Sequence, residues 1–138
     1  MSALISITRQ QKQAMLTHIL SCLPEEGCGL ISGTQDGEVV SVIPITNELH
    51  SQTAFQMAPQ EQIQAFLQIE KNNLDLIAVY HSHPNGLARP SESDIDQFQY
   101  PGVIQLIWSY QNSKWRLNGF IIENRLAREG ALNLISET

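Results

Sequence analysis

The chain has 138 residues and a formal net charge of −6, from 14 acidic and 8 basic side chains. This length suits one domain with a single core, and 42% hydrophobic against 16% charged residues excludes a disordered chain. Binders of nucleic acid or anionic membranes concentrate basic residues on one face, whereas here the basic residues are spread along the chain. We therefore expect residues 1–138 to form one globular domain with no nucleic-acid or membrane partner.

The N-terminal residues and the two cysteines indicate the compartment. No charged segment precedes an apolar run, as a secretory signal requires, and no apolar stretch approaches the roughly 20 residues that span a bilayer. Cys22 and Cys28 in a domain of this kind are typical of the reducing cytosol. We expect a cytoplasmic protein.

The N-terminal half predicts a strand, a helix and a hairpin. Residues 3–8 predict the strand, and residues 8–23 predict a helix with Thr8 as its N-cap. The apolar positions at helical spacing, which we expect to be buried, are Met15, Leu16, Ile19, Leu20 and Leu23. Strands at 29–33 and 38–46 follow, joined by a turn that contains Asp36-Gly37.

The remaining elements alternate between helix and strand. Residues 54–57 predict a short strand, and Pro59 begins a second helix whose expected buried stripe is Ile63, Phe66 and Leu67. The apolar run 74–81 predicts a central strand covered on both faces. The further expected elements are a short helix at 91–100 and a hairpin with strands 103–110 and 115–123. This order predicts an α/β (α+β) sandwich with a mixed, mostly antiparallel sheet flanked by two or three helices.

The chemistry-bearing segment is His81-Ser82-His83-Pro84, followed by Ser91 and Asp94. Two histidines at i and i+2 at the end of a strand project from one face and can bind one metal ion. The loop after Pro84 can return Asp94 as a third ligand. Two imidazoles and one carboxylate suit catalytic Zn²⁺, one ion per chain, with the fourth position open to water.

A metal-bound water also needs a general base that is not a ligand. Glu26, in Pro24-Glu25-Glu26-Gly27-Cys28-Gly29, is the candidate, and Glu25 is its alternative. Ser91 and Asp94 also form the S-x-x-D pattern of a helix capping box, which explains both residues without chemistry. Cys28 is interpreted as a small buried residue, with a redox or inhibitory role as the alternative.

These residues together resemble the JAMM (MPN+) metallopeptidase family, in its short prokaryotic form. The family motif places a Glu in P-x-E-x-C-G-L, then H-x-H-P, then Ser and Asp eight and eleven residues beyond the second His. The positions that match are Glu26, His81, His83, Ser91 and Asp94, and Asn47 and Phe55-x-Met57-x-Pro59 also match. The signatures of zinc deaminases and of H-E-x-x-H zincins are absent from the sequence.

The resemblance implies a cytidine-deaminase-like sandwich and a zinc peptidase or isopeptidase. The bond cleaved would follow the glycine-rich C-terminus of a ubiquitin-like protein, with zinc held by His81, His83 and Asp94. Glu26 would be the general base, and Ser91 would donate to the developing oxyanion. Eukaryotic relatives carry ubiquitin-gripping insertions, whereas only eight residues separate Asp94 from Val103 here. The expected partner is therefore a small ubiquitin-like sulfur carrier.

The same resemblance admits a second class, a non-catalytic MPN-type interaction module. Members of that class lose the Glu or a ligand, whereas this chain keeps all of the motif residues. An extended substrate tail commonly binds by adding a strand to a sheet edge. The segment 47–57 is the candidate for part of that groove.

Overall fold

A computed structural model of the chain describes residues 4–130 and 132–135. Its centre is a six-stranded sheet in the order β3-β2-β4-β5-β6-β7, and only β4 and β5 pair in parallel. The strands of this sheet are β2 (Cys28–Gly33), β3 (Val39–Ile45), β4 (Asp75–His83), β5 (Ile104–Gln111), β6 (Lys114–Glu123) and β7 (Leu126–Glu129). The predicted mixed, mostly antiparallel sheet is confirmed.

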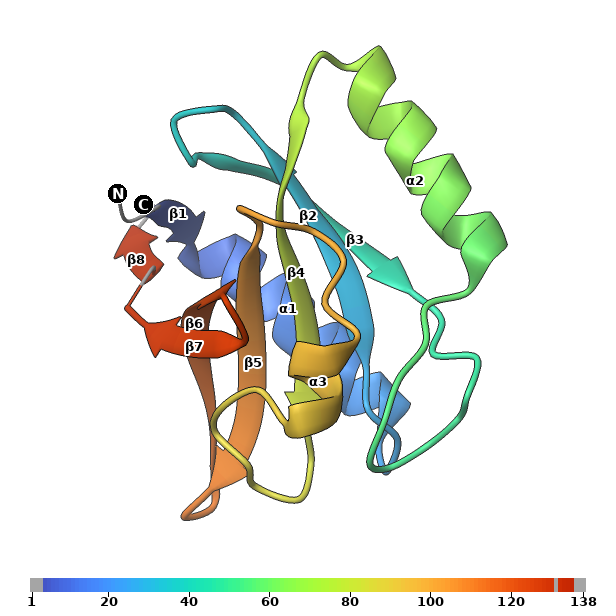
Figure 1. The fold of residues 1–138 in the computed structure, drawn as a ribbon, viewed down its shortest axis with the longest axis vertical. Coiled ribbons are helices and arrows are strands. Elements are labelled where there is room, and N and C mark those ends of the chain that lie inside the picture. The colour runs from blue at the N-terminus through green and yellow to red at the C-terminus, as the bar shows by residue number, and fades with distance from the viewer. Residues whose placement is uncertain (1–3, 131, 136–138) are drawn as a thin grey trace.

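Helices cover both faces of this sheet (Figure 1). One face packs against α1 (Arg9–Cys22) and against a separate parallel pair, β1 (Ile5–Thr8) with β8 (Leu132–Ile135). The other face carries α2 (Pro59–Lys71) and the short α3 (Glu92–Asp96). No helix within the described ranges is long and apolar enough to cross a membrane.

Strand β4 contributes to both layers because successive side chains of a strand point to opposite faces. Ala78 and Tyr80 are buried in the cluster beneath α1, whereas Val79 is buried in the cluster beneath α2. His81 and His83 follow Val79 at intervals of two, so both imidazoles lie on the α2 face. The strand extends to His83, two residues beyond its predicted end.

The first helix begins as predicted, but its buried stripe is narrower. Thr8 caps it through a reciprocal capping box with Gln11. Met15 and Ile19 are fully buried, and Leu16 packs against their cluster. Leu20 and Leu23 were predicted to be buried, and this is wrong: they are 41% and 43% exposed. The fully buried side chains of the helix therefore lie four residues apart, at Met15 and Ile19.

The second helix also begins as predicted, at Pro59, but it presents a different face to the sheet. Ile63 and Leu67 are 55% and 63% exposed, so their predicted burial is wrong. Ala65 and Ile69 are buried instead, and Phe66 packs against the same core. The small Ala65 side chain lets the helix lie close to the sheet, and the larger neighbours then point to solvent.

Smaller differences concern the ends of elements. Residues 54–57 form no strand but a single bridge between Asn47 and Met57. The predicted helix 91–100 ends at Asp96. Strands β7 and β8 were not predicted, because β7 (Leu-Ala-Arg-Glu) and β8 are too short to show a clear period.

Candidate metal centre and adjacent cleft

His81 and His83 converge on one point at the end of β4. Their Nε2 atoms lie 3.0 Å apart, and each lies close to Oδ2 of Asp94, at 3.0 Å from His81 and 3.1 Å from His83. His81 is fully buried and stacks on Phe55, with ring centroids 4.5 Å apart. The structure therefore brings together three potential ligand atoms from β4 and α3.

Asp94 is held in place by the start of its own helix. Ser91 is the N-cap of α3: its Oγ accepts a hydrogen bond from the amide of Asp94 (3.1 Å), and its amide donates to Asp94 Oδ2 (2.8 Å). The predicted capping box is thus present. It leaves the hydroxyl hydrogen of Ser91 free of this bond, because the cap uses an oxygen lone pair.

Glu26 reaches the same point from the segment before β2. Cys28 is paired in register with His81, and Gly27 and Ser82 exchange hydrogen bonds of 2.8 and 3.0 Å. The Glu26 side chain is buried, and ligand atoms of Glu26, His81 and His83 all lie within 4.8 Å of one another. Glu25 points elsewhere, to a surface ion pair with His50 at 3.1 Å.

The electrostatics of the cluster favour a cation at its centre. His83 Nδ1 lies 2.7 Å from the carbonyl oxygen of Leu87, and a carbonyl only accepts, so Nδ1 must carry the hydrogen. In neutral His83 the lone pair of Nε2 then faces the Asp94 carboxylate, an acceptor facing an acceptor. A positive charge between these atoms removes that conflict, so the residues present fit a metal ion.

The pKa shifts of the carboxyl groups follow from burial and from these contacts. Burial raises the pKa of Glu26 to about 7, although the charge of His83 opposes the shift, and one of its oxygens, Oε1, is buried without a hydrogen-bond partner. Burial would also raise the pKa of Asp94, but its contacts with the imidazoles of His81 and His83 and with the Ser91 amide hold it well below its usual range. Burial thus favours the neutral form of Glu26, whereas its contacts favour the ionised form of Asp94.

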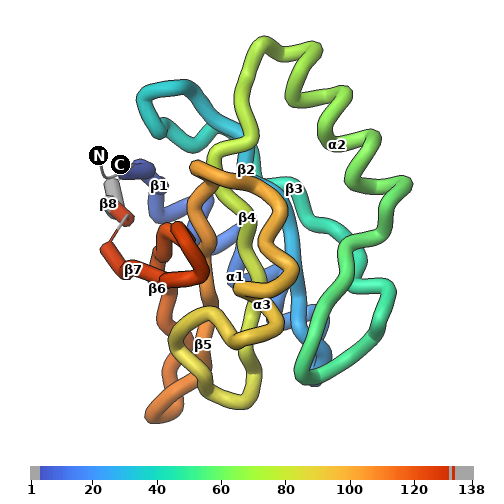
Figure 2. The backbone as a smooth tube through the Cα atoms, in the orientation of Figure 1, coloured from blue at the N-terminus to red at the C-terminus, as the bar shows by residue number. Residues whose placement is uncertain are grey.

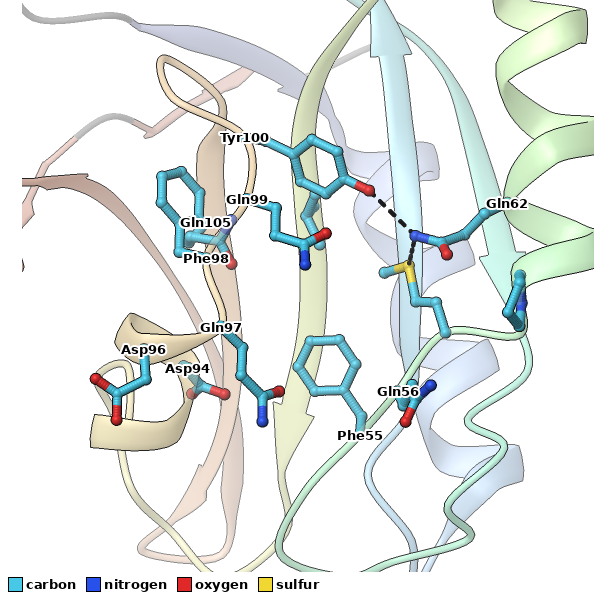
Figure 3. Close-up of a pocket in the computed structure, with 13 residues that line it drawn as sticks. Phe55, Gln56, Gln62, Asp94, Asp96, Gln97, Phe98, Gln99, Tyr100 and Gln105 are labelled. Atoms are coloured by element: carbon cyan, nitrogen blue, oxygen red, sulfur yellow. Dashed lines mark hydrogen bonds between the residues drawn. The ribbon is translucent and has the colours of Figure 1, made fainter.

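A cleft of about 510 Å³ leads away from this cluster along the sheet (Figure 3). One wall comes from the chain around α2 and the other from the segment that follows Asp94. Five side-chain amides line it, together with apolar groups and the carboxylates of Asp94 and Asp96. The lining residues include Phe55, Gln56, Met57, Gln62, Gln97, Phe98, Gln99, Tyr100 and Gln105. Gln62 spans the cleft with a hydrogen bond of 3.1 Å to the Tyr100 hydroxyl.

Comparison with known proteins agrees with this arrangement. The model of a family described as prokaryotic homologs of the JAB domain matches residues 8–118, most of the chain. The chain belongs to this family. The resemblance noted in the sequence is thereby confirmed.

Two curated relatives of this JAB-domain homolog are named for protein cleavage. A probable TtuB-protein conjugate cleaving protease of Thermus thermophilus is 40% identical over 60% of this chain. The alignment covers only 55% of that relative, so this chain matches about half of its length. A desampylase of Haloferax volcanii is 28% identical over 78% of the chain and 82% of its own length.

Solved structures confirm the fold of the JAB-domain homolog. A solution structure of a protein from Desulfitobacterium hafniense is 34% identical and has a TM-score of 0.87, covering 97% of this chain and 94% of that one. A JAB1/MPN domain protein from Archaeoglobus fulgidus has a TM-score of 0.61 at 23% identity, with coverage of 98% and 100%. The second likeness shows the fold alone, and it confirms the predicted MPN-type sandwich.

Three site features were not given a role from the sequence. Ser82 points away from the two histidines, and its bond to Gly27 holds the segment before β2 that carries Glu26. The Leu87 carbonyl sets the hydrogen position of His83. Asn47, quoted above only as a family match, donates to the carbonyl of Glu26. Only Asn47 had a signal in the sequence. The Gly27–Ser82 bond depends on how two distant segments pack, and the Leu87 contact depends on the path of the loop after β4.

Proposed function

We propose that the chain is a zinc-dependent peptidase or isopeptidase formed by one JAMM-type domain, residues 1–138. In this proposal His81, His83 and Asp94 hold Zn²⁺, Glu26 is the general base and Ser91 assists the oxyanion. The observation that carries it is the convergence of two imidazole nitrogens and a carboxylate oxygen within 3.0–3.1 Å of one another, beside the buried Glu26. Two nitrogen ligands, one oxygen ligand and an open position suit catalytic zinc.

The groups around that open position have separate roles in the proposed reaction. Zinc bound there would supply Lewis acidity toward a water molecule and a substrate carbonyl. Glu26, buried beside the ligand atoms of His81 and His83, accepts the proton of the attacking water and returns it to the leaving amine. The Ser91 hydroxyl, whose hydrogen is not used by the helix cap, donates to the carbonyl oxygen as negative charge develops on it.

The proposed substrate is a conjugate or C-terminal extension of a ubiquitin-like sulfur-carrier protein. The two relatives' names refer to cleaving TtuB conjugates and to desampylation, which supports this class. The chain from the end of α3 to the start of β5 is short, residues 97–103, and leaves no room there for a ubiquitin-gripping insertion.

The cleft supports a glycine-rich tail as the bound segment. Such a tail offers only backbone N–H and C=O groups, and the amides of Gln56, Gln62, Gln97, Gln99 and Gln105 can donate to and accept from these groups. Residues 55–57 form one wall of the cleft, which supports the segment 47–57 as part of the groove.

The test is cleavage of a ubiquitin-like carrier fused to a C-terminal extension, read by intact mass. We expect the purified chain to hold about one zinc ion and to release the extension directly after the terminal glycine. Glu26→Gln should keep the metal and abolish cleavage, whereas Glu25→Gln, on the neighbouring surface residue, should keep both the metal and the cleavage. A protein that binds no zinc, with unchanged stability in chelator, would support the non-catalytic MPN-type module instead.

A further inference from the structure

A line of hydrogen bonds connects the far end of β5 to the candidate ligand His83. The side-chain amide of Gln111, the last residue of β5, donates to the carbonyl oxygen of Gly86 over 2.6 Å. The amide of Gly86 donates to the carbonyl oxygen of His83 over 3.0 Å. The next residue, Leu87, accepts from His83 Nδ1 over 2.7 Å. Gln111 therefore binds the loop at Gly86, the residue before Leu87, whose carbonyl contacts the imidazole of His83.

Little else fixes this part of the loop by packing. The Leu87 side chain is 46% exposed, so it does not anchor its own carbonyl in the core. Gly86 has φ of +95°, and a Cβ there would lie 3.2 Å from the carbonyl oxygen of Tyr110, so only glycine fits comfortably. The loop passes close to the end of β5 at this point, and the polar bond from Gln111 holds the two together.

The position of the Leu87 carbonyl matters because it selects the tautomer of His83. A neutral imidazole carries its hydrogen on one nitrogen only, and the partner of that nitrogen determines which one. Here the carbonyl places the hydrogen on Nδ1 and leaves the Nε2 lone pair pointing at the site. Partners that orient a metal-binding histidine in this way typically change metal affinity about 10–100-fold when lost.

We propose that Gln111 is a positioning residue that fixes the loop 84–90 so that Leu87 holds His83 in its metal-binding tautomer. This inference rests on the proposed function in that it takes His83 as a zinc ligand. Gln111 itself touches neither the cluster nor the cleft lining described above. Its effect passes through the backbone of Gly86 and Leu87.

The test compares Gln111→Met with Lys114→Met. Methionine has nearly the shape of glutamine but no N–H donor, and Lys114 is the cross-strand partner of Gln111 at the same hairpin end. One readout is zinc affinity in competition with a chelator, and the other is the nitrogen-15 spectrum of the His83 ring in metal-free protein at alkaline pH. We expect Gln111→Met to lose about tenfold in zinc affinity, the low end of the range for direct partners. Its ring nitrogens should move toward the averaged values of mixed tautomers.

Lys114→Met should match the wild type in both readouts. Gln111→Glu serves as a second variant, because its carboxylate has the same shape and only accepts; it should also give mixed tautomers. Gln111 variants with the ring spectrum and zinc affinity of Lys114→Met would overturn the inference. If the wild type binds no zinc, the proposed function fails, and the ring spectrum still decides whether Gln111 controls the tautomer.

Discussion

Asn47 ties the segment after β3 to the backbone of Glu26. Its side-chain amide donates to the Glu26 carbonyl over 3.0 Å and to the Ala54 carbonyl over 3.1 Å. Its side-chain oxygen accepts from the amides of Leu49 and Gln56, each over 3.1 Å. The Glu26 amide in turn donates to Ser51 of the same loop. Asn47 therefore links the candidate base to the wall of the cleft. Figure 2 shows this loop and the loop 84–90 at the same end of the molecule.

We predict that Asn47→Ala destabilises the protein by about 3 kcal/mol or more, because each buried group left unpaired costs about 1–3 kcal/mol. Urea unfolding measures the loss, and Gln64→Ala on the exposed side of α2 should stay within about 0.5 kcal/mol of the wild type. Asn47→Asp keeps the acceptor but loses both donors. If Asn47→Asp is as stable as the wild type, the bonds to Glu26 and Ala54 contribute nothing.

Gly29 lies opposite Tyr80 on β4 and leaves room for its ring. A Cβ at this position would lie 2.2–2.5 Å from three atoms of the ring, closer than real contacts allow. The ring cannot easily move, because its hydroxyl bonds to His18 Nδ1 at 2.7 Å and Tyr80 is fully buried. Packing against Tyr80, the residue before His81, therefore explains why the family motif has a glycine at this position.

We predict that Gly29→Ala destabilises the protein by about 3 kcal/mol, the upper range for overpacking a core. The smaller ring-free side chain of Tyr80→Leu should relieve the clash, so the double variant should be less unstable than the sum of the single changes. Urea unfolding of the four proteins gives the coupling energy. Additive effects would show that the two side chains do not compete for the same space.

The fold could be predicted from the sequence where the pattern of apolar residues fits only one kind of element. The run 74–81 and the hairpin after Val103 read unambiguously as strands, and both formed. On α2 the spacing of Ile63 and Leu67 fitted a helix, but Ala65 and Ile69 fitted equally well, and only the distance to the sheet decides between them. The predicted helix 91–100 ended early, and Tyr100 packs edge-on against Phe66 on α2.

The site was predictable where local geometry determines it. Two histidines two residues apart on a strand share a face, and a capping box fixes the Asp94 carboxylate relative to the Ser91 backbone. The Gln111–Gly86 contact joins residues 25 apart in sequence and has no local pattern. Such a bond depends on the register between the end of β5 and a loop, which no periodicity reports.

Cys28 is predicted to be unreactive in the folded protein. Its side chain is fully buried, its Sγ faces the Ile45 carbonyl at 3.5 Å, and burial raises the pKa of its thiol to about 12. Since the thiolate is the reactive form, we expect iodoacetamide to label the half-buried Cys22 first and Cys28 only after unfolding. Peptide mass mapping before and after urea treatment distinguishes the two sites. Labelling of Cys28 in the native state would revive a redox or inhibitory role.

Glu26 should make the stability of the metal-free protein depend on pH. Its pKa is about 7 in the folded protein and 4.5 in a solvent-exposed carboxyl, with burial as the main cause. The folded state thus holds this proton more tightly than the unfolded state does. The stability contribution is present below about pH 4.5 and is lost as the pH rises through about 7.

We predict that the free energy of unfolding of Glu26→Gln, relative to that of the wild type, rises by about 2–3 kcal/mol from about pH 5 to about pH 8 in the presence of chelator. The reason is that a shift of one pKa unit corresponds to about 1.4 kcal/mol. Urea unfolding of both proteins at each pH measures this change. Groups that titrate alike in both proteins cancel when the two free energies are subtracted. Glu48→Gln, at an exposed residue, is the control for removing one negative charge. Added zinc should shrink the pH dependence, since a nearby cation favours the carboxylate. A difference that stays constant with pH would mean that Glu26 is already ionised in the folded, metal-free protein, and that burial does not hold its proton.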